Sequence, residues 1–188
     1  MGIESFPIKP GSSTKPVPGF NVQIVDPSGK YVYVPAGSSV YQYTIGAGGA
    51  LSAMTAPTVP AGSTPQSITI DPAGKYAYVA NNLDGSVSAY AVDAATGRLH
   101  FTGKTAAGAS PQAVAVDPQN RFVYVANLGG GNVSAYTIDA TSGALTAVSG
   151  SPFTVATSPN SIVVDPSGQF VYVTASTSVY AFTINATT

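Results

Sequence analysis

Apolar and polar residues alternate along most of the chain with a period of two, as in "SITI" from Ser67, "YAYVA" from Tyr76 and "SVSAYAV" from Ser86. Successive side chains of a strand point to opposite faces of its sheet, so this alternation predicts half-buried β-strands. An apolar pattern of i, i+3, i+4 and i+7, as a helix requires, is not sustained over about ten residues anywhere. The pattern therefore predicts an all-β protein.

One segment occurs four times, at intervals of about 45 residues, which is a spacing typical of propeller blades and of larger solenoid units. Each copy begins with an Asp-Pro pair, whose aspartates are Asp26, Asp71, Asp117 and Asp165. Proline presets φ for a type I turn, and the aspartate side chain can accept the turn's amides. The fourth position needs a positive φ, and it holds Gly29, Gly74, Asn120 and Gly168. Asparagine tolerates that conformation best after glycine, which supports the turn.

Each copy contains the signals of four strands. After the Asp-Pro turn we expect a second strand at 31–34, 76–79, 122–125 and 170–173. A polar loop follows, then a third strand around Val40, Val87, Val133 and Val179. A second turn, "DAATGRL" from Asp93 and "DATSGAL" from Asp139, leads into a weaker, proline-containing strand suited to a sheet edge. Four antiparallel strands in each repeat predict the blades of a β-propeller.

The stretches "YVANNLDGSVSAYAVDAATGRL" and "YVANLGGGNVSAYTIDATSGAL" resemble the YVTN-type propeller repeat. That repeat is found in surface-layer proteins and in lactonase-like seven-bladed propellers, and the resemblance covers essentially the whole chain. It implies a single propeller domain over residues 1–188. The expected blades are 20–64, 65–110, 111–158, and 159–188 completed by 1–19.

The two chain ends predict how the fourth blade is completed. "NATT" at the C-terminus followed by "GIES" at the N-terminus reproduces "DATS" followed by "GALT", so the N-terminal strand is expected to close the last blade. Closure within one chain gives a four-bladed monomer, and closure between two chains gives an eight-bladed homodimer. A fragment of a larger propeller is the third possibility. Inner strands rich in Val and Ile favour the larger, dimeric ring.

Charge and composition exclude several classes of function. Seven Lys and Arg residues balance eight Asp and Glu residues, so we expect no nucleic-acid partner. The chain has no cysteine and one histidine, His100, and we expect no metal and no cofactor. We also expect no membrane insertion, since no apolar run approaches about 20 residues. Abundant glycine and proline with scarce charge indicate an extracellular or cell-surface protein.

The likeliest place for a ligand is the propeller face that carries the loops after the second strands. Its candidate ligand-binding residues are Asn81, Asn82, Asp84, Asn127 and Asn132. They could hydrogen-bond a glycan or a peptide, or they could cap their own loops. The four Asp-Pro aspartates, on the opposite face, are expected to be structural. His100 is not expected to be catalytic, and the tyrosines that recur once in each blade are expected to pack between blades.

These observations favour a non-enzymatic scaffold or recognition module, or a minimal half-propeller that assembles with itself, with no catalytic residues. The alternative is a lactonase-like hydrolase acting on a sugar lactone at the central channel, as the resemblance implies. Hydrolysis needs acidic, basic or metal groups that converge on one place. Charges outside the turns are few, and none recurs in a way that would bring several together, so we expect the non-enzymatic function.

Overall fold

In the computed structural model, the described residues are 26–155 and 158–185, and they form β-strands with a single short 3₁₀ helix. The first sheet contains β1 (Tyr31–Ala36), β2 (Ser39–Ile45) and β3 (Leu51–Pro60), with the helix η1 (Ala47–Gly49) between the last two. The second sheet contains β4 (Pro65–Ile70), β5 (Tyr76–Asn81), β6 (Ser86–Val92) and β7 (Leu99–Ala106).

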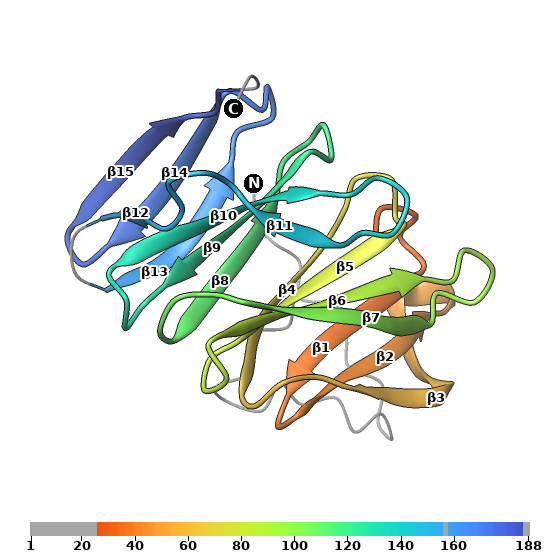
Figure 1. The fold of residues 1–188 in the computed structure, drawn as a ribbon. Coiled ribbons are helices and arrows are strands. Elements are labelled where there is room, and N and C mark those ends of the chain that lie inside the picture. The colour runs from red at the N-terminus through yellow and green to blue at the C-terminus, as the bar shows by residue number, and fades with distance from the viewer. Residues whose placement is uncertain (1–25, 156–157, 186–188) are drawn as a thin grey trace, which may run out of the picture.

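The remaining strands form two more sheets. The third contains β8 (Pro111–Val116), β9 (Phe122–Asn127), β10 (Asn132–Ile138), β11 (Leu145–Ala147) and β12 (Phe153–Thr154). The fourth contains β13 (Pro159–Val164), β14 (Phe170–Ala175) and β15 (Ser178–Thr183). Each pair of adjacent strands is antiparallel. The four sheets follow one another along an arc, from the orange first sheet to the blue fourth sheet (Figure 1).

The Asp-Pro turns form as the sequence predicts. Asp71 accepts hydrogen bonds from the amides of Lys75 at 2.6 Å and Tyr76 at 3.1 Å. Asp26, Asp117 and Asp165 accept the equivalent amides in their own turns. The fourth positions have positive φ, between 60° at Asn120 and 71° at Gly29. Asn120 also donates to the Asp71 carboxylate at 2.8 Å, so the turns of neighbouring sheets are joined.

The hydrophobic core lies between sheets, in three layers. Alternate residues of one strand face opposite neighbours: Tyr78 packs against the third sheet, whereas Val79 packs against the first. The same division holds for Tyr124 and Val125 one sheet later. The recurring aromatic residues therefore fill the space between blades, as the sequence predicts.

The described residues confirm the strand pattern and leave the ring size open. Residues 20–25, where the inner strand of the first blade is expected before the Asp-Pro turn, lie outside the described residues. So does the N-terminal closing strand expected at 1–19, and the first and fourth sheets each contain three described strands. The outer strand of the third sheet is divided into β11 and β12, both paired with β10. Within the described ranges, no helix is long and apolar enough to cross a membrane.

Candidate functional site

The loops after the second strands share one face with the connections between sheets. The amides of Asn82 and Leu83 donate to the carbonyl oxygens of Thr64 and Ser63 at 2.9 and 3.2 Å. In the third sheet the Leu128 amide donates to the Ser110 carbonyl oxygen at 2.9 Å in the same way. Each loop is thus held against the connection that enters its own sheet, and this arrangement forms the face on which the sequence places the candidate ligand-binding residues.

Asn81 ties its sheet to this connection. Its buried Oδ1 accepts a hydrogen bond from the Gly62 amide at 3.0 Å, and its Nδ2 donates to the hydroxyls of Ser86 and Ser88 at 3.1 and 2.9 Å. A Cβ atom at Gly62 would lie only 2.5 Å from Asn81 Cγ, so the glycine permits this close approach. The described hydrogen bonds of the Asn81 side chain are thus all made to groups of its own protein chain.

Asn127 has the equivalent position in the third sheet. Its Nδ2 donates to Asn132 Oδ1 at 2.8 Å and to the Ser134 hydroxyl at 2.9 Å. Its Oδ1 is buried and has no described hydrogen-bond partner. Asn132 in turn donates to the Gly130 carbonyl oxygen at 2.9 Å. The pair therefore orders the loop between β9 and β10 and keeps one acceptor unoccupied.

Asn82 points to the next sheet. Its Nδ2 donates to the Pro111 carbonyl oxygen at 3.3 Å and to Gln112 Oε1 at 3.4 Å. This amide therefore links the loop of the second sheet to the inner strand of the third. The structure does not bring the four asparagines together at one point, since each bonds to its own loop or to an adjacent sheet.

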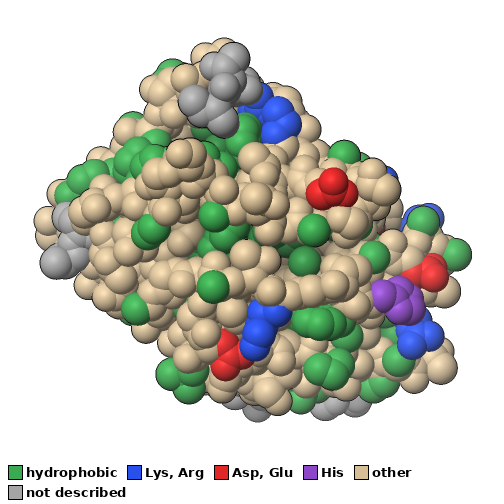
Figure 2. Space-filling view, in the orientation of Figure 1, with side chains coloured by type: hydrophobic (Ala, Val, Ile, Leu, Met, Phe, Trp, Pro, Cys, Tyr) green, Lys and Arg blue, Asp and Glu red, His purple; other side chains and the backbone are tan. Residues whose placement is uncertain are grey.

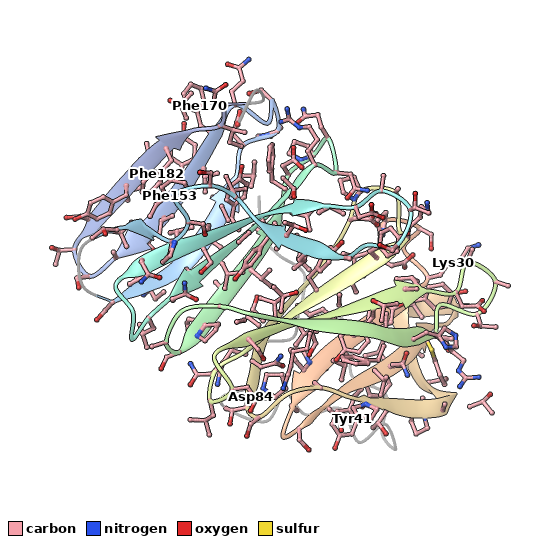
Figure 3. All side chains as sticks on the ribbon, viewed as in Figure 1. Lys30, Tyr41, Asp84, Phe153, Phe170 and Phe182 are labelled. Carbon is pink, nitrogen blue, oxygen red and sulfur yellow. The ribbon has the colours of Figure 1, made fainter. Side chains whose placement is uncertain are left out.

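Asp84 is the candidate residue with a charged neighbour. Its Oδ2 accepts the Ser63 amide at 2.9 Å and lies 3.5 Å from Lys104 Nζ. Lys104 comes from β7, opposite Ser88 in the β6 register, so the loop and the outer strand of one sheet supply the two charges. Both side chains remain partly exposed, and Figure 3 shows Asp84 at the loop end of the second sheet.

This pair lines a cavity of about 350 Å³ between the first two sheets, which we call the Asp84–Lys104 groove. Its other lining residues are Ser38, Pro60, Ala61, Gly62, Ser63, Ser88 and Phe101. Phe101 is 53% exposed, and its ring is held edge-on to Tyr90 with 5.7 Å between the ring centroids. The groove therefore combines a carboxylate, an ammonium group, hydroxyls and an aromatic surface, within the size range of small-molecule sites.

The other described cavities offer less chemistry. A cavity of about 220 Å³ between the third and fourth sheets has no charged residue in its described lining. A groove of about 540 Å³ between the second and third sheets has Lys104 as its one charged lining residue. Charged side chains are sparse on the face drawn in Figure 2, and near its lower edge one acidic and one basic side chain adjoin.

The other acidic side chains of the described residues accept hydrogen bonds within turns. Burial acts to raise the pKa of Asp26, but hydrogen bonds from Ser28, Tyr31 and Lys30 outweigh burial, and the pKa lies below its usual value. Hydrogen bonds from Thr96 and the Ala95 amide likewise lower the pKa of Asp93. Among residues 26–155 and 158–185, no three His, Asp or Glu side chains gather where they could hold a metal ion.

Comparison with protein families matches residues 10–188 to a family described as "Lactonase, 7-bladed beta-propeller". No curated protein matches the chain significantly. Many solved structures share the fold. A proposed 6-phosphogluconolactonase from Bacteroides fragilis aligns over 97% of this chain and 55% of its own, with 20% identity and a TM-score of 0.80.

Two further structures have similar folds. The periplasmic gluconolactonase PpgL of Pseudomonas aeruginosa aligns over 89% of this chain and 51% of its own, with 24% identity and a TM-score of 0.77. A protein of unknown function from Desulfotomaculum acetoxidans covers the same shares, with 21% identity and a TM-score of 0.74. The chain therefore spans about half the length of these structures, and at such identities the likeness shows the fold alone.

These findings correct the functional prediction from the sequence. The match to the lactonase family favours the lactonase alternative, so the prediction of a non-enzymatic scaffold is wrong. That prediction relied on the scarcity of charge and on charges that do not recur between repeats. It counted Lys104 among those charges, but it did not predict that Lys104 and Phe101 of the outer strand lie beside Asp84. The register of the β6–β7 hairpin, counted outward from the turn at Asp93, is the signal that places Lys104 beside the loop.

Proposed function

Because the chain belongs to the family of seven-bladed lactonase propellers, we propose that it hydrolyses a sugar lactone in the Asp84–Lys104 groove. The carboxylate–ammonium pair at 3.5 Å, beside an exposed aromatic ring, is the observation that carries the proposal. The groove lies on the loop face between two blades, rather than in the central channel that the sequence suggested.

Asp84 is proposed as the general base. In lactone hydrolysis a water oxygen bonds to the carbonyl carbon, the ring C–O bond breaks, and the product is a sugar acid. The attacking water gives a proton to Asp84, which returns it to the ring oxygen as that oxygen leaves. The Ser63 amide and Lys104 both bind Oδ2, so Oδ1 is the carboxylate oxygen that faces no described donor.

Lys104 is proposed to stabilise the negative charge that develops on the carbonyl oxygen. A fixed cation aimed at developing charge lowers the barrier more in a partly enclosed groove than in water. The exposed Phe101 ring offers an apolar surface for the C–H face of a sugar, and the hydroxyls of Ser38 and Ser63 lie within the same lining. The four asparagines are proposed to hold the loops of this face, and they are not part of the described lining of the groove: Asn81, Asn82, Asn127 and Asn132.

The charge of the groove indicates an unphosphorylated substrate. A phosphate group carries nearly two negative charges at neutral pH and is usually bound by several cations or by amide clusters. Lys104 is the one cation in the described lining, and it is already paired with Asp84. A neutral sugar lactone therefore fits the groove better than a phosphorylated one.

We extend the proposal to the type of repeat, the location of the protein and the closure of the fourth blade. The sequences "YVAN" in β5 and β9, with their Asp-Pro turns, support repeats of the YVTN type. The composition supports an extracellular or cell-surface location. The likeness of "GIES" from Gly2 to "GALT" from Gly143 supports completion of the fourth blade by the N-terminal strand.

Turnover of sugar lactones tests the proposed function. The chain is assayed against five- and six-membered sugar lactones and their phosphorylated forms, with spontaneous hydrolysis subtracted. We expect turnover of neutral lactones, and a loss on the order of 10²-fold in Lys104→Gln. Lys75→Gln, which changes a lysine outside the groove lining, is the matched control. Absence of turnover above the spontaneous rate, or equal loss in both variants, would contradict the proposal.

A further inference from the structure

Neighbouring sheets are joined by one contact that is made twice in the described chain. Tyr33 donates from its hydroxyl to the Gly97 carbonyl oxygen at 2.5 Å, and Tyr78 donates to that of Gly143 at 3.0 Å. Two residues before each of these tyrosines, a second aromatic ring lies over the same glycine. We call this contact, made by two aromatic residues of one sheet and a turn glycine of the next, the clasp.

The clasp needs glycine at the turn. A Cβ atom at Gly97 would lie 2.5 Å from the ring of Tyr31, and one at Gly143 would overlap the ring of Tyr76 in the same way. Both glycines are buried, with φ of 70° and 73°. The turn and the two rings are therefore complementary surfaces that fit without any side chain between them.

Gly49 occupies the equivalent turn position in the first sheet. It stands two residues before Leu51, as Gly97 stands two residues before Leu99, and its φ is 78°. Gly49 is exposed, and no described atom lies within 4 Å of the position where its Cβ would be. The first sheet therefore presents the glycine half of a clasp, and no aromatic ring of residues 26–155 or 158–185 lies over it.

The fourth sheet presents the other half. Phe170 and Tyr172 occupy the strand positions of Tyr76 and Tyr78, but they are 37% and 39% exposed, whereas the latter are 6% and 0% exposed. Val163 and Val179 on the same face are 56% and 67% exposed. This apolar face of the fourth sheet, defined by Val163, Phe170, Tyr172 and Val179, has the character of an interface.

We propose that the apolar face of the fourth sheet binds the first sheet of a second copy of this chain, with Phe170 and Tyr172 clasping Gly49 of that copy. The first sheet, which carries Gly49, lies at the other end of the arc from the fourth sheet. In Figure 3, Tyr41 of the first sheet is far from Phe170 of the fourth. Such a contact is heterologous, so it is satisfied only in a ring or a filament. In a pair of copies the contact can be made twice, once at each end of the arc.

The proposal does not depend on lactonase activity, and mass in solution tests it. Light scattering on a sizing column should give about twice the 18.8 kDa of one chain. Val179→Lys places a charge in the interface and should return the mass to that of one chain. Leu83→Lys is the matched control, because Leu83 is 73% exposed and lies outside the apolar face.

A second pair of variants tests the clasp itself. Gly49→Ala and Gly48→Ala strain the same turn, since both glycines have positive φ and open space around them. Gly49→Ala alone should weaken the dimer. Val179→Lys and Gly49→Ala chains should form mixed dimers more readily than either variant forms dimers with itself, because one intact contact remains in a mixed pair. A single-chain mass for the unaltered protein, or a dimer that survives Val179→Lys, would overturn the proposal.

Discussion

The Tyr78 hydroxyl donates a hydrogen bond to the Gly143 carbonyl oxygen at 3.0 Å, although the two residues belong to different sheets and are 65 positions apart. Tyr78 is fully buried, and burial raises the pKa of its hydroxyl above the usual value. The bond fixes the second sheet against the turn of the third. Contacts of this kind set the angle between sheets, and that angle places the loops of adjacent sheets on one face.

Replacing Tyr78 by phenylalanine should lower the free energy of unfolding by about 1–3 kcal/mol, because the buried Gly143 carbonyl oxygen loses its tyrosine donor. Urea denaturation followed by circular dichroism measures the change. Tyr41→Phe is the control, since Tyr41 is 39% exposed, and it should leave stability almost unaltered. Equal stabilities of the two variants would show that the interblade hydrogen bond contributes nothing.

Replacing Gly97 by alanine should cost at least about 2 kcal/mol. The residue has a φ of 70°, and the added Cβ would meet the Tyr31 ring at 2.5 Å. Gly103→Ala provides the comparison, because no atom lies within 4 Å of its Cβ position and its φ is not positive. Thermal unfolding of both variants measures the difference. A Gly97→Ala protein as stable as Gly103→Ala would contradict the close packing between the first two sheets.

Stability should decline in alkaline solution. Burial raises the pKa of Tyr90 and of Tyr124 to about 12 from the model-compound value of 10.0, with Asp117 adding to the effect at Tyr124. The unfolded chain then loses these protons at lower pH than the folded chain does. The stabilisation is complete below pH 10.0 and is lost as pH rises towards 12.

The Tyr124→Phe variant checks this pH dependence. Denaturation measured at several values between pH 10 and 12 should give a shallower decline for this variant than for the unaltered protein. The control is Tyr41→Phe, because Tyr41 is more exposed than Tyr124. Identical slopes for Tyr124→Phe and the unaltered protein would show that the Tyr124 hydroxyl does not titrate differently in the two states.

Much of the fold is predictable from sequence because its rules are local. The Asp-Pro turns, including Asn120 at a position of positive φ, depend on residues within one turn, and period-two alternation determines the faces of each strand. The division of the third sheet's outer strand into β11 and β12 is less predictable. Edge strands lack a second pairing partner, so their sequence constrains their pairing weakly.

The site is only partly predictable. Asp84 lies in a polar loop whose place in the propeller follows from strand order, so the sequence can name it as a candidate. Its pairing with Lys104 depends on the register between β6 and β7, which contains a shift between Ala89 and Tyr90. The groove also needs the connection at Ser63 from the preceding sheet. Such combinations arise from tertiary contacts, so counting charges along the chain underestimated the chemistry available.

The kcat/KM of Asp84→Asn on a neutral six-membered sugar lactone tests the central claim most directly. Asparagine keeps the acceptor for the Ser63 amide but cannot take a proton from water, so the loop should stay in place while catalysis falls. Asp139→Asn, in an exposed turn of the third sheet, is the matched control. The account predicts a loss of about 10²- to 10⁴-fold for Asp84→Asn alone. A kcat/KM equal to that of the unaltered protein would contradict a catalytic role for Asp84 and for the groove around it.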